Sequence, residues 1–160
     1  MLIDTPLLIT GSGPASLIIA KLASGRGLSS LIAGHSSSQD QTAVLLSKGA
    51  VNILSPHGLF YVLRPYLLSH DPVHISRAAF EQVLKHHCVA DMNTTVYDNF
   101  SFTPIRNDIE ARWSGIISDG TSSWDICADA WIDTAKISAD LQTAISSSDR
   151  IVTDLLTKLI

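Results

Sequence analysis

Cysteine and charge are both scarce in this sequence. Cys88 and Cys127 are its only cysteines, and they do not form a Cys-x-x-Cys pair. Two isolated thiols exclude a disulfide framework and indicate free cysteines in a cytoplasmic protein. Charged residues make up 16% of the 160 residues, the net charge is -4, and no run of Lys and Arg is interleaved with aromatics. This charge pattern argues against a nucleic-acid partner.

Long hydrophobic runs are also missing. No apolar run reaches the roughly 18–20 residues that a membrane helix needs, so no membrane partner is expected. The first residues contain Asp4 and no basic stretch, which is not the pattern of a signal peptide. Hydrophobic residues nevertheless account for 46% of the chain. That share and the length are typical of one globular domain.

Residues 6–34 have the pattern of a strand, a helix and a second strand. A short apolar run ends at Gly11, and Pro14 suits the first turn of a helix that Gly25 would end. A second apolar run, residues 28–34, predicts another buried strand. Together these segments predict a right-handed βαβ unit.

The turn inside this unit resembles a dinucleotide-binding loop. Such loops use one glycine for the tight turn and a second for close approach to a pyrophosphate, which sits at the helix N-terminus. Gly11 and Gly13 stand at these two positions, and Ser16 takes the place of the third glycine. We therefore expect Gly11, Gly13, Pro14 and the N–H groups of Ala15 and Ser16 to bind a pyrophosphate.

The second anchor of a dinucleotide, an acid for the ribose hydroxyls, is missing from its expected place. That acid follows the second strand of the unit, about 20 residues after the glycines. Gly34 stands at this position, His35 follows, and the nearest acid is Asp40. A small NAD-binding domain of the Rossmann type is therefore a less favoured alternative.

The rest of the chain divides into three parts. Residues 40–90 predict a helical insert, with short helices over 42–54 and 56–68 and a clear helix that begins after Ser76. Residues 94–135 are rich in β-branched and aromatic residues and predict strands, with a turn at 119–122. Residues 136–160 have helical spacing. The predicted fold class is α/β, with a Rossmann-like βαβ unit and an adjoining antiparallel β-hairpin.

These segments resemble, in the same order, FAD-dependent oxidoreductases of the glutathione-reductase-like superfamily. The pattern is most similar to single-component flavin monooxygenases of the aromatic-hydroxylase type, to flavin-dependent halogenases, and to related enzymes that mature protein-derived quinones. The resemblance implies that Arg77 lies beside the flavin and that Asp133, in the segment 128–136, approaches the cofactor. It also implies that residues 1–160 are part of an FAD/NAD(P)-binding domain, whose final residues begin the connection to a substrate domain.

The resemblance implies a function as well as a fold. In the family, NAD(P)H reduces FAD, and O2 then supports hydroxylation or halogenation of an organic substrate, here a small molecule or a protein-bound group. Ser16, Gly34 and Lys136 depart from the family pattern at cofactor contacts, and family members continue well beyond this length. The alternative is therefore a non-catalytic truncated remnant, or a binding module that needs a partner chain to supply the missing half.

No catalytic residue and no metal ligand is assigned from the sequence. His86, His87 and Cys88 are adjacent on a predicted helix, so their side chains point in different directions and would chelate a metal poorly. The predicted cofactor-binding residues are Gly11, Gly13, Pro14, Ala15, Ser16, Arg77 and Asp133.

Overall fold

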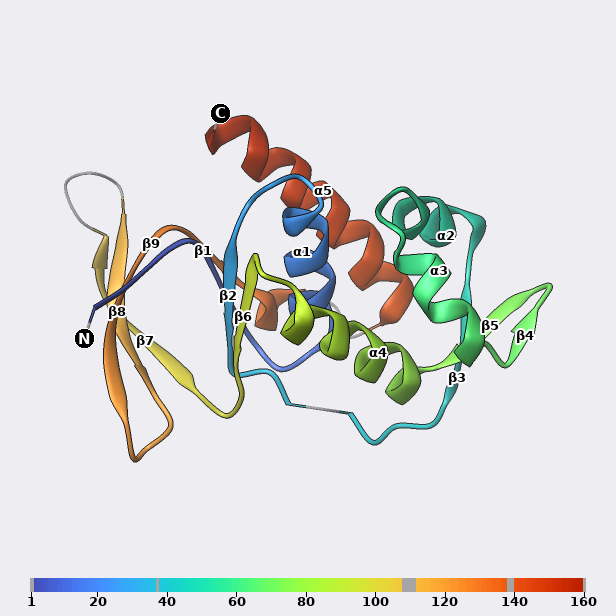
Figure 1. Cartoon of the computed structure of the whole chain (residues 1–160), viewed down its shortest axis with the longest axis horizontal. Helices are drawn as coiled ribbons and strands as arrows, with labels where there is room; N and C mark the ends of the chain where they lie inside the picture. Colours follow the sequence, from blue (N-terminus) through green and yellow to red (C-terminus); the bar gives the residue numbers. More distant parts are fainter. Residues whose placement is uncertain (1, 37, 108–111, 138–139, 160) are drawn as a thin grey trace.

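A six-stranded mixed sheet forms one side of the protein, at the left in Figure 1, in the computed structural model, which describes residues 2–36, 38–107, 112–137 and 140–159. The strand order is β6-β2-β1-β9-β8-β7, and a separate antiparallel sheet has the order β3-β5-β4. The strands are β1 (Leu2–Thr10), β2 (Ser30–Ala33), β3 (Ala43–Leu46), β4 (Ser69–His70), β5 (Val73–Ser76), β6 (Thr94–Tyr97), β7 (Ser101–Asn107), β8 (Trp113–Ser118) and β9 (Ser123–Asp133). The α-helices are α1 (Pro14–Ser24), α2 (Lys48–Leu54), α3 (Leu59–Leu63), α4 (Arg77–Ala90) and α5 (Leu141–Leu159), and three short 3-10 helices are η1 (Ser55–His57), η2 (Arg64–Tyr66) and η3 (Thr134–Lys136).

The predicted βαβ unit is present. Strand β1 pairs in parallel with β2, from Leu7 opposite Ser30 to Thr10 opposite Ala33, and α1 connects the two strands. The paired parts of the two strands, residues 7–9 and 31–33, are apolar and buried, as expected for parallel strands that are covered on both faces. Helix α1 begins at Pro14 as expected.

Helices cover one face of the large sheet. Figure 1 shows α1, α4 and α5 lying side by side on this face. Leu17, Ile18 and Leu22 of α1 are fully buried, and so are Ile145 and Val152 of α5. The helical spacing noted in the last part of the sequence therefore forms a helix whose apolar side packs on α1.

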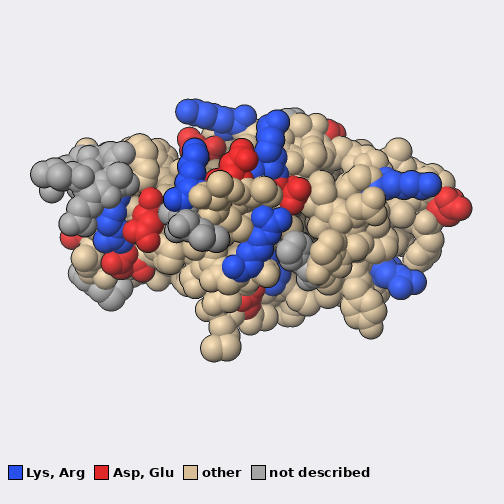
Figure 2. Space-filling view, turned by 90° about the horizontal axis from the view of Figure 1, so that it is seen from above, with Lys and Arg blue, Asp and Glu red and all other residues tan. Residues whose placement is uncertain are grey.

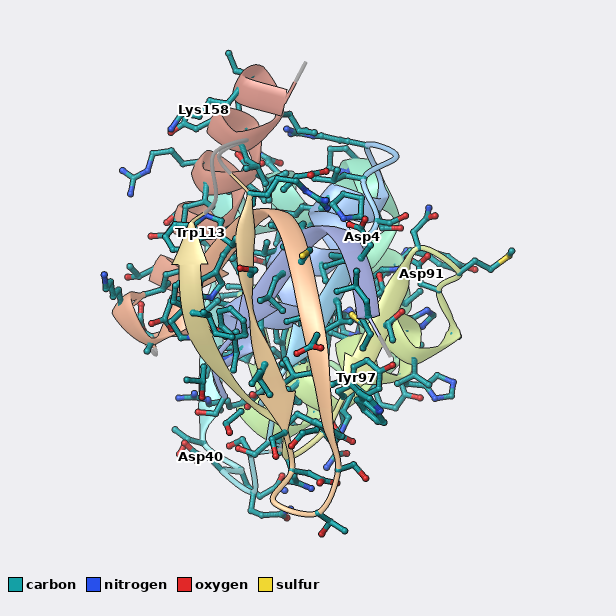
Figure 3. The ribbon with its side chains drawn as sticks, turned by 90° about the vertical axis from the view of Figure 1, so that its left-hand side faces the viewer. Asp4, Asp40, Asp91, Tyr97, Trp113 and Lys158 are labelled. Atoms are coloured by element: carbon teal, nitrogen blue, oxygen red, sulfur yellow. The ribbon has the colours of Figure 1, made fainter. Side chains whose placement is uncertain are left out.

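On the other face, side chains of β1 and β2 pack with side chains of β8 and β9 of the same sheet and with aromatic rings. Leu8 and Leu31 pack there with Ile117 and Ile126 from β8 and β9. Figure 3 looks onto the antiparallel strands β7, β8 and β9, with Trp113 and Tyr97 labelled. Strand β9 pairs antiparallel with β8 and, along its other edge, in parallel with β1. A single strand therefore joins the antiparallel part to the βαβ unit.

Rings from β6, β9 and the loop before β7 line this second face. The Phe100 and Trp124 rings are stacked with their centroids 5.2 Å apart, and Tyr97 meets Phe100 edge-on at 5.2 Å. Such aromatic pairs contribute about 0.5–1.5 kcal/mol each beyond the area they bury. They fix the position of the loop between β6 and β7.

The insert differs from the sequence prediction in its first part. Residues 43–46, expected to be helical, form strand β3 and pair antiparallel with β5. Helices at 48–54 and 59–63 agree with the prediction. Helix α4 begins directly after Ser76, as predicted. Ser76 is its N-cap, because its hydroxyl accepts a hydrogen bond from the Ala79 N–H at 3.1 Å.

Within the described residues no helix is both long and apolar enough to cross a bilayer. Lys, Arg, Asp and Glu are interspersed over the left and middle of the face seen in Figure 2.

The turn predicted at 119–122 is confirmed, since the Asp119 carboxylate accepts hydrogen bonds from the backbone N–H groups of Thr121 and Ser122.

Candidate functional site

The glycine-rich loop follows β1 at the edge of the sheet where the parallel strands end. Gly11 has a φ of +125°, and a Cβ built on it would lie 2.0 Å from Oγ1 of Thr134. The Gly11 N–H donates to the Ala33 carbonyl at 3.3 Å. Both the backbone conformation and the neighbouring side chain therefore require glycine at this position.

Residues at the end of β9 close over this loop. The Thr134 hydroxyl donates to the Thr10 carbonyl at 2.7 Å, and the Trp131 indole N–H donates to the Thr10 hydroxyl at 3.0 Å. The Asp133 carboxylate accepts the Ala135 N–H at 3.0 Å. The segment that the sequence placed near the cofactor is thus in direct contact with the residue before Gly11.

The N-terminus of α1 is open for an anion. Gly13 is its N-cap in an extended conformation, no side chain caps it, and no acidic residue lies in the first turn. A Cβ on Gly13 would meet nothing within 4 Å. The positive end of the helix, with the N–H groups of Ala15 and Ser16, is therefore suited to bind a phosphate group.

Ser16 stands at the position of the third glycine, and its small side chain fits inside the packed first turn of α1. It is fully buried, and its hydroxyl donates to the Gly13 carbonyl at 3.1 Å. The hydroxyl is satisfied inside the first turn of α1. This serine therefore preserves the close packing that the third glycine provides in dinucleotide-binding loops.

A cavity of about 580 Å³ lies beside the loop. It opens at the ends of β1, β2 and β9 and against the loop before β7. Its volume falls within the range of small-molecule sites, roughly 300–1,000 Å³. Ligand-binding clefts of α/β sheets lie at this edge, outside the carboxyl ends of the strands. The lining residues that matter here are Gly11, Ser12, Gly34, Asn99, Trp131 and Asp133.

The missing ribose acid has a structural explanation. Gly34 has a φ of +89°, and a Cβ on it would lie 3.0 Å from the carbonyl oxygen of Phe100. The Gly34 N–H also donates to the Tyr97 carbonyl at 3.3 Å. An acidic side chain at this position would be strained and would meet the backbone of the β6–β7 loop. The fold therefore favours glycine where dinucleotide-binding proteins place an acid.

His35, next to Gly34, is buried beneath the site. It is 1% exposed, and neither ring nitrogen has a hydrogen-bond partner among the described residues. Burial lowers the pKa of His35 and the nearby Lys85 lowers it further, and together they outweigh the opposite effects of Asp98 and of the Gly13 backbone. The imidazole is therefore neutral at pH 7 and does not replace the ribose acid.

Arg77, predicted to lie beside the flavin, does not line this cavity. Its Nε lies 3.4 Å from the Glu81 carboxylate, and its backbone N–H donates to the Thr42 carbonyl at 3.1 Å. The Glu81 side chain is 2% exposed. Burial raises the pKa of Glu81, and Arg77 opposes this rise. The arginine is thus the partner of a buried carboxylate at the start of α4.

The structure brings most of the predicted site together. Gly11 and Asp133 line one cavity, and Gly13, Pro14, Ala15 and Ser16 form the helix start beside it. Sequence reasoning missed Asn99, Phe100 and Trp131. Asn99 has a φ of +62°. Asn tolerates this left-handed conformation, so an Asn within a segment of predicted strands was the available sequence signal for a turn here. Lys136 is exposed in η3 and does not line the cavity.

The fold of this chain is similar to that of several solved monooxygenases and hydroxylases. p-Nitrophenol 4-monooxygenase PnpA from Pseudomonas putida DLL-E4 matches 83% of this chain with a TM-score of 0.70 and 15% identity. The anhydrotetracycline hydroxylase OxyS from Streptomyces rimosus matches 82% with a TM-score of 0.69 and 12% identity. The flavin-dependent monooxygenase PieE, solved with FAD and substrate, matches 81% with a TM-score of 0.65 and 17% identity.

The chain covers only part of each of these proteins. It spans 41% of PnpA, 31% of OxyS and 30% of PieE. No family model and no curated protein matches the sequence. At this level of identity the likeness establishes the fold.

Proposed function

We propose that this chain is an FAD-binding oxidoreductase of the monooxygenase type. The observation that carries the proposal is the open N-terminus of α1 beside the cavity at the ends of β1, β2 and β9. The solved neighbours with this architecture include a monooxygenase in complex with FAD. The fold and the anion-binding geometry therefore support the same cofactor.

The residues of the loop fit a pyrophosphate. Gly11 makes the turn, Gly13 leaves its outer side open, and the N–H groups of Ala15 and Ser16 would bind the phosphate oxygens. Asp133 lines the same cavity, where its carboxylate would accept hydrogen bonds from hydroxyl groups of the cofactor. With Gly34 in the ribose position, Ser12 and Asn99 are the polar side chains left to contact the sugar.

FAD, when bound, supplies the redox chemistry, and the protein positions it. NAD(P)H is the proposed reductant and O2 the proposed oxidant, with hydroxylation or halogenation of an organic substrate as the overall reaction. In this chain Gly11, Gly13 and Ser16 bind and orient the cofactor, while the rings of Phe102 and Trp131 form an apolar wall of the cavity. The substrate, a small molecule or a protein-bound group, is part of the same proposal.

The test is a titration with FAD, followed by flavin fluorescence, on a pair of charge-matched variants. Gly13→Asp places a carboxylate at the N-cap of α1, where there is room for it. Asp is a good N-cap residue, so the variant folds, but its carboxylate occupies the helix N–H groups and repels a pyrophosphate. Gly49→Asp adds the same charge to the first turn of α2, away from the site.

The expected result is saturable quenching by the wild type and by Gly49→Asp. Gly13→Asp should weaken FAD binding by about tenfold or more, which corresponds to about 1.4 kcal/mol. Far-UV circular dichroism should be the same for all three proteins. Fluorescence that does not change with the wild type, or equal affinity for both variants, would overturn the proposal.

The second candidate is a binding module that needs another polypeptide segment for catalysis. It is motivated by coverage, because the 160 residues span 41% of PnpA, 31% of OxyS and 30% of PieE. In that case the chain would bind FAD, but the FAD-loaded chain would not oxidise NAD(P)H on its own. Steady oxidation of NAD(P)H by the chain alone would exclude this candidate.

A further inference from the structure

A second cavity lies away from the FAD site, between α3, η2 and α4. Its volume is about 570 Å³, and it shares no lining residue with the cavity at the glycine-rich loop. The apolar floor consists of Val62, Ala79 and Val83. We call it the α3–α4 cavity.

Two aromatic side chains border the α3–α4 cavity and remain open to solvent. Tyr61 is 75% exposed and Tyr66 is 54% exposed, and both are lining residues. Singly exposed aromatics are ordinary, but two beside an apolar hollow form a surface suited to another flat, apolar group. The rings and the floor together indicate an aromatic ligand.

The polar rim of the α3–α4 cavity has one sign of charge. Arg64, His86 and His87 line it, and none of its lining residues is acidic. Arg64 forms no ion pair with another described residue, unlike Arg77 with Glu81. Its guanidinium therefore keeps both of its donor edges free for a planar anion such as a carboxylate.

The histidines add hydrogen-bonding capacity to this rim. Their rings meet edge-on with centroids 5.9 Å apart. Burial lowers the pKa of His87, and Lys21 and His86 lower it further, so His87 is neutral at pH 7. Arg64 therefore places a fixed positive charge on the rim, which favours an anionic ligand.

We propose that the α3–α4 cavity binds a small aromatic monocarboxylate, with the carboxylate at Arg64 and the ring over the apolar floor. The ligand is a compound distinct from FAD, so this site stands independently of the proposed flavin function. Because the α3–α4 cavity shares no lining residue with the cavity at the glycine-rich loop, the two ligands would bind at separate places.

The test uses 1-naphthoate, titrated by isothermal calorimetry into the flavin-free protein. The uncharged 1-naphthamide has the same rings, and cyclohexanecarboxylate has the charge without the aromatic system. Arg64→Gln removes the charge, and Ala79→Leu fills the floor. Arg150→Gln removes a charge from an exposed position on α5 and is the matched control.

Wild type and Arg150→Gln should bind 1-naphthoate saturably. Arg64→Gln and Ala79→Leu should each weaken binding by about tenfold or more, and so should both altered ligands. Binding must also persist in the presence of saturating FAD, or of ADP if FAD does not bind. Equal binding of naphthamide, displacement by either nucleotide, no effect of both variants, or no saturable heat would overturn the proposal. Arg64 is exposed, so its variant tests the site even if Ala79→Leu disturbs folding.

Discussion

Gly11 lies where the ends of β1 and β9 come together, and there is room at this position only for a residue without a side chain. The Thr134 hydroxyl fills the space that any Cβ at Gly11 would need. That hydroxyl is itself held by the Thr10 carbonyl. The first glycine of the loop is therefore required by tertiary packing as well as by its own turn.

Gly11→Ala should destabilise the fold strongly. The positive φ alone costs about 1–3 kcal/mol for a residue with a side chain, and the contact with Thr134 adds to it. Urea denaturation measures the loss. Gly120→Ala is the control, because Gly120 has a φ of +90° but nothing within 4 Å of a built Cβ. Equal losses for both variants would show that the contact with Thr134 does not matter.

The predictable residues of the site were those whose role is local. Gly11, Gly13 and Pro14 could be assigned from a short stretch because turn and helix start depend on neighbours in sequence. The reason for Gly34 could not, since it depends on the Phe100 carbonyl in a distant loop. Phe100 itself gives no sign in the sequence that it covers the end of β2.

At the scale of elements, the start of α4 depends on a buried ion pair. Glu81 is held inside the protein by Arg77, one turn earlier on the same helix. Removing one partner of such a pair leaves the other charged and desolvated. The role predicted for Arg77 beside a flavin therefore has to be separated from this structural role.

Arg77→Gln should destabilise the fold more at pH 7 than at pH 5. The pKa of Glu81 is raised in the folded state, so between the unfolded and the folded pKa the folded protein holds a proton that the unfolded chain has lost. Stability therefore falls as pH rises through the folded pKa, above which Glu81 is charged and paired with Arg77. Without Arg77 the pKa rises further and the loss extends over a wider range of pH. We expect about 1–3 kcal/mol at pH 7, measured by urea denaturation at both pH values.

The double variant Arg77→Gln/Glu81→Gln separates the two roles. It removes the buried charge, so it should recover most of the stability lost in Arg77→Gln. If the double variant binds FAD with unchanged affinity, Arg77 does not contact the flavin, and its role is to stabilise the buried Glu81 carboxylate. Weaker binding in a stable double variant would support the flavin contact.

The elements that sequence reasoning placed correctly have strong local signals. Helix α4 has the Ser76 cap and regular apolar spacing, and β8 and β9 are joined by a turn rich in Gly, Ser and Thr. Strand β3 was missed because its four residues, AVLL, form a continuous apolar run that also fits a helix. Its pairing with β5, far along the chain, decides the outcome.

At the scale of the whole molecule, one carboxylate ties two helices together. Asp91, which follows α4 and is labelled in Figure 3, accepts hydrogen bonds from the Ser24 hydroxyl at 2.6 Å and the Lys21 ammonium at 2.9 Å, both on α1. Burial alone would raise the pKa of Asp91. These bonds, and one from the Asn93 N–H, outweigh burial and lower the pKa to about 2.

This carboxylate should make the protein sensitive to acid. Because the folded pKa is depressed below the unfolded value of 3.8, its contribution is present above pH 4 and is lost as pH falls toward 2. Asp91→Asn should cost about 1–2 kcal/mol at pH 7 and much less at pH 2.5. Urea denaturation at both pH values tests this.

Asp98→Asn is the control for this acid sensitivity. Asp98 pairs with Lys85 at 2.8 Å, but its side chain is 46% exposed. An exposed pair of this kind contributes only about 0–1 kcal/mol. A loss at pH 7 as large as that of Asp91→Asn would contradict a special role for the bridge between α1 and α4.

The pairing of β1 with β9 also governs the order in which the molecule is built. The glycine-rich loop stands near the beginning of the chain, yet Thr10 and Gly11 are held by Trp131 and Thr134 near its other end. Contacts between such distant residues form late, because closing a long loop costs entropy before any bond repays it. During synthesis on the ribosome, β1 lacks its pairing partner β9 until the chain has been extended through residues 123–133. The glycine-rich loop is therefore translated well before β9, and it takes its final shape only when β9 is present.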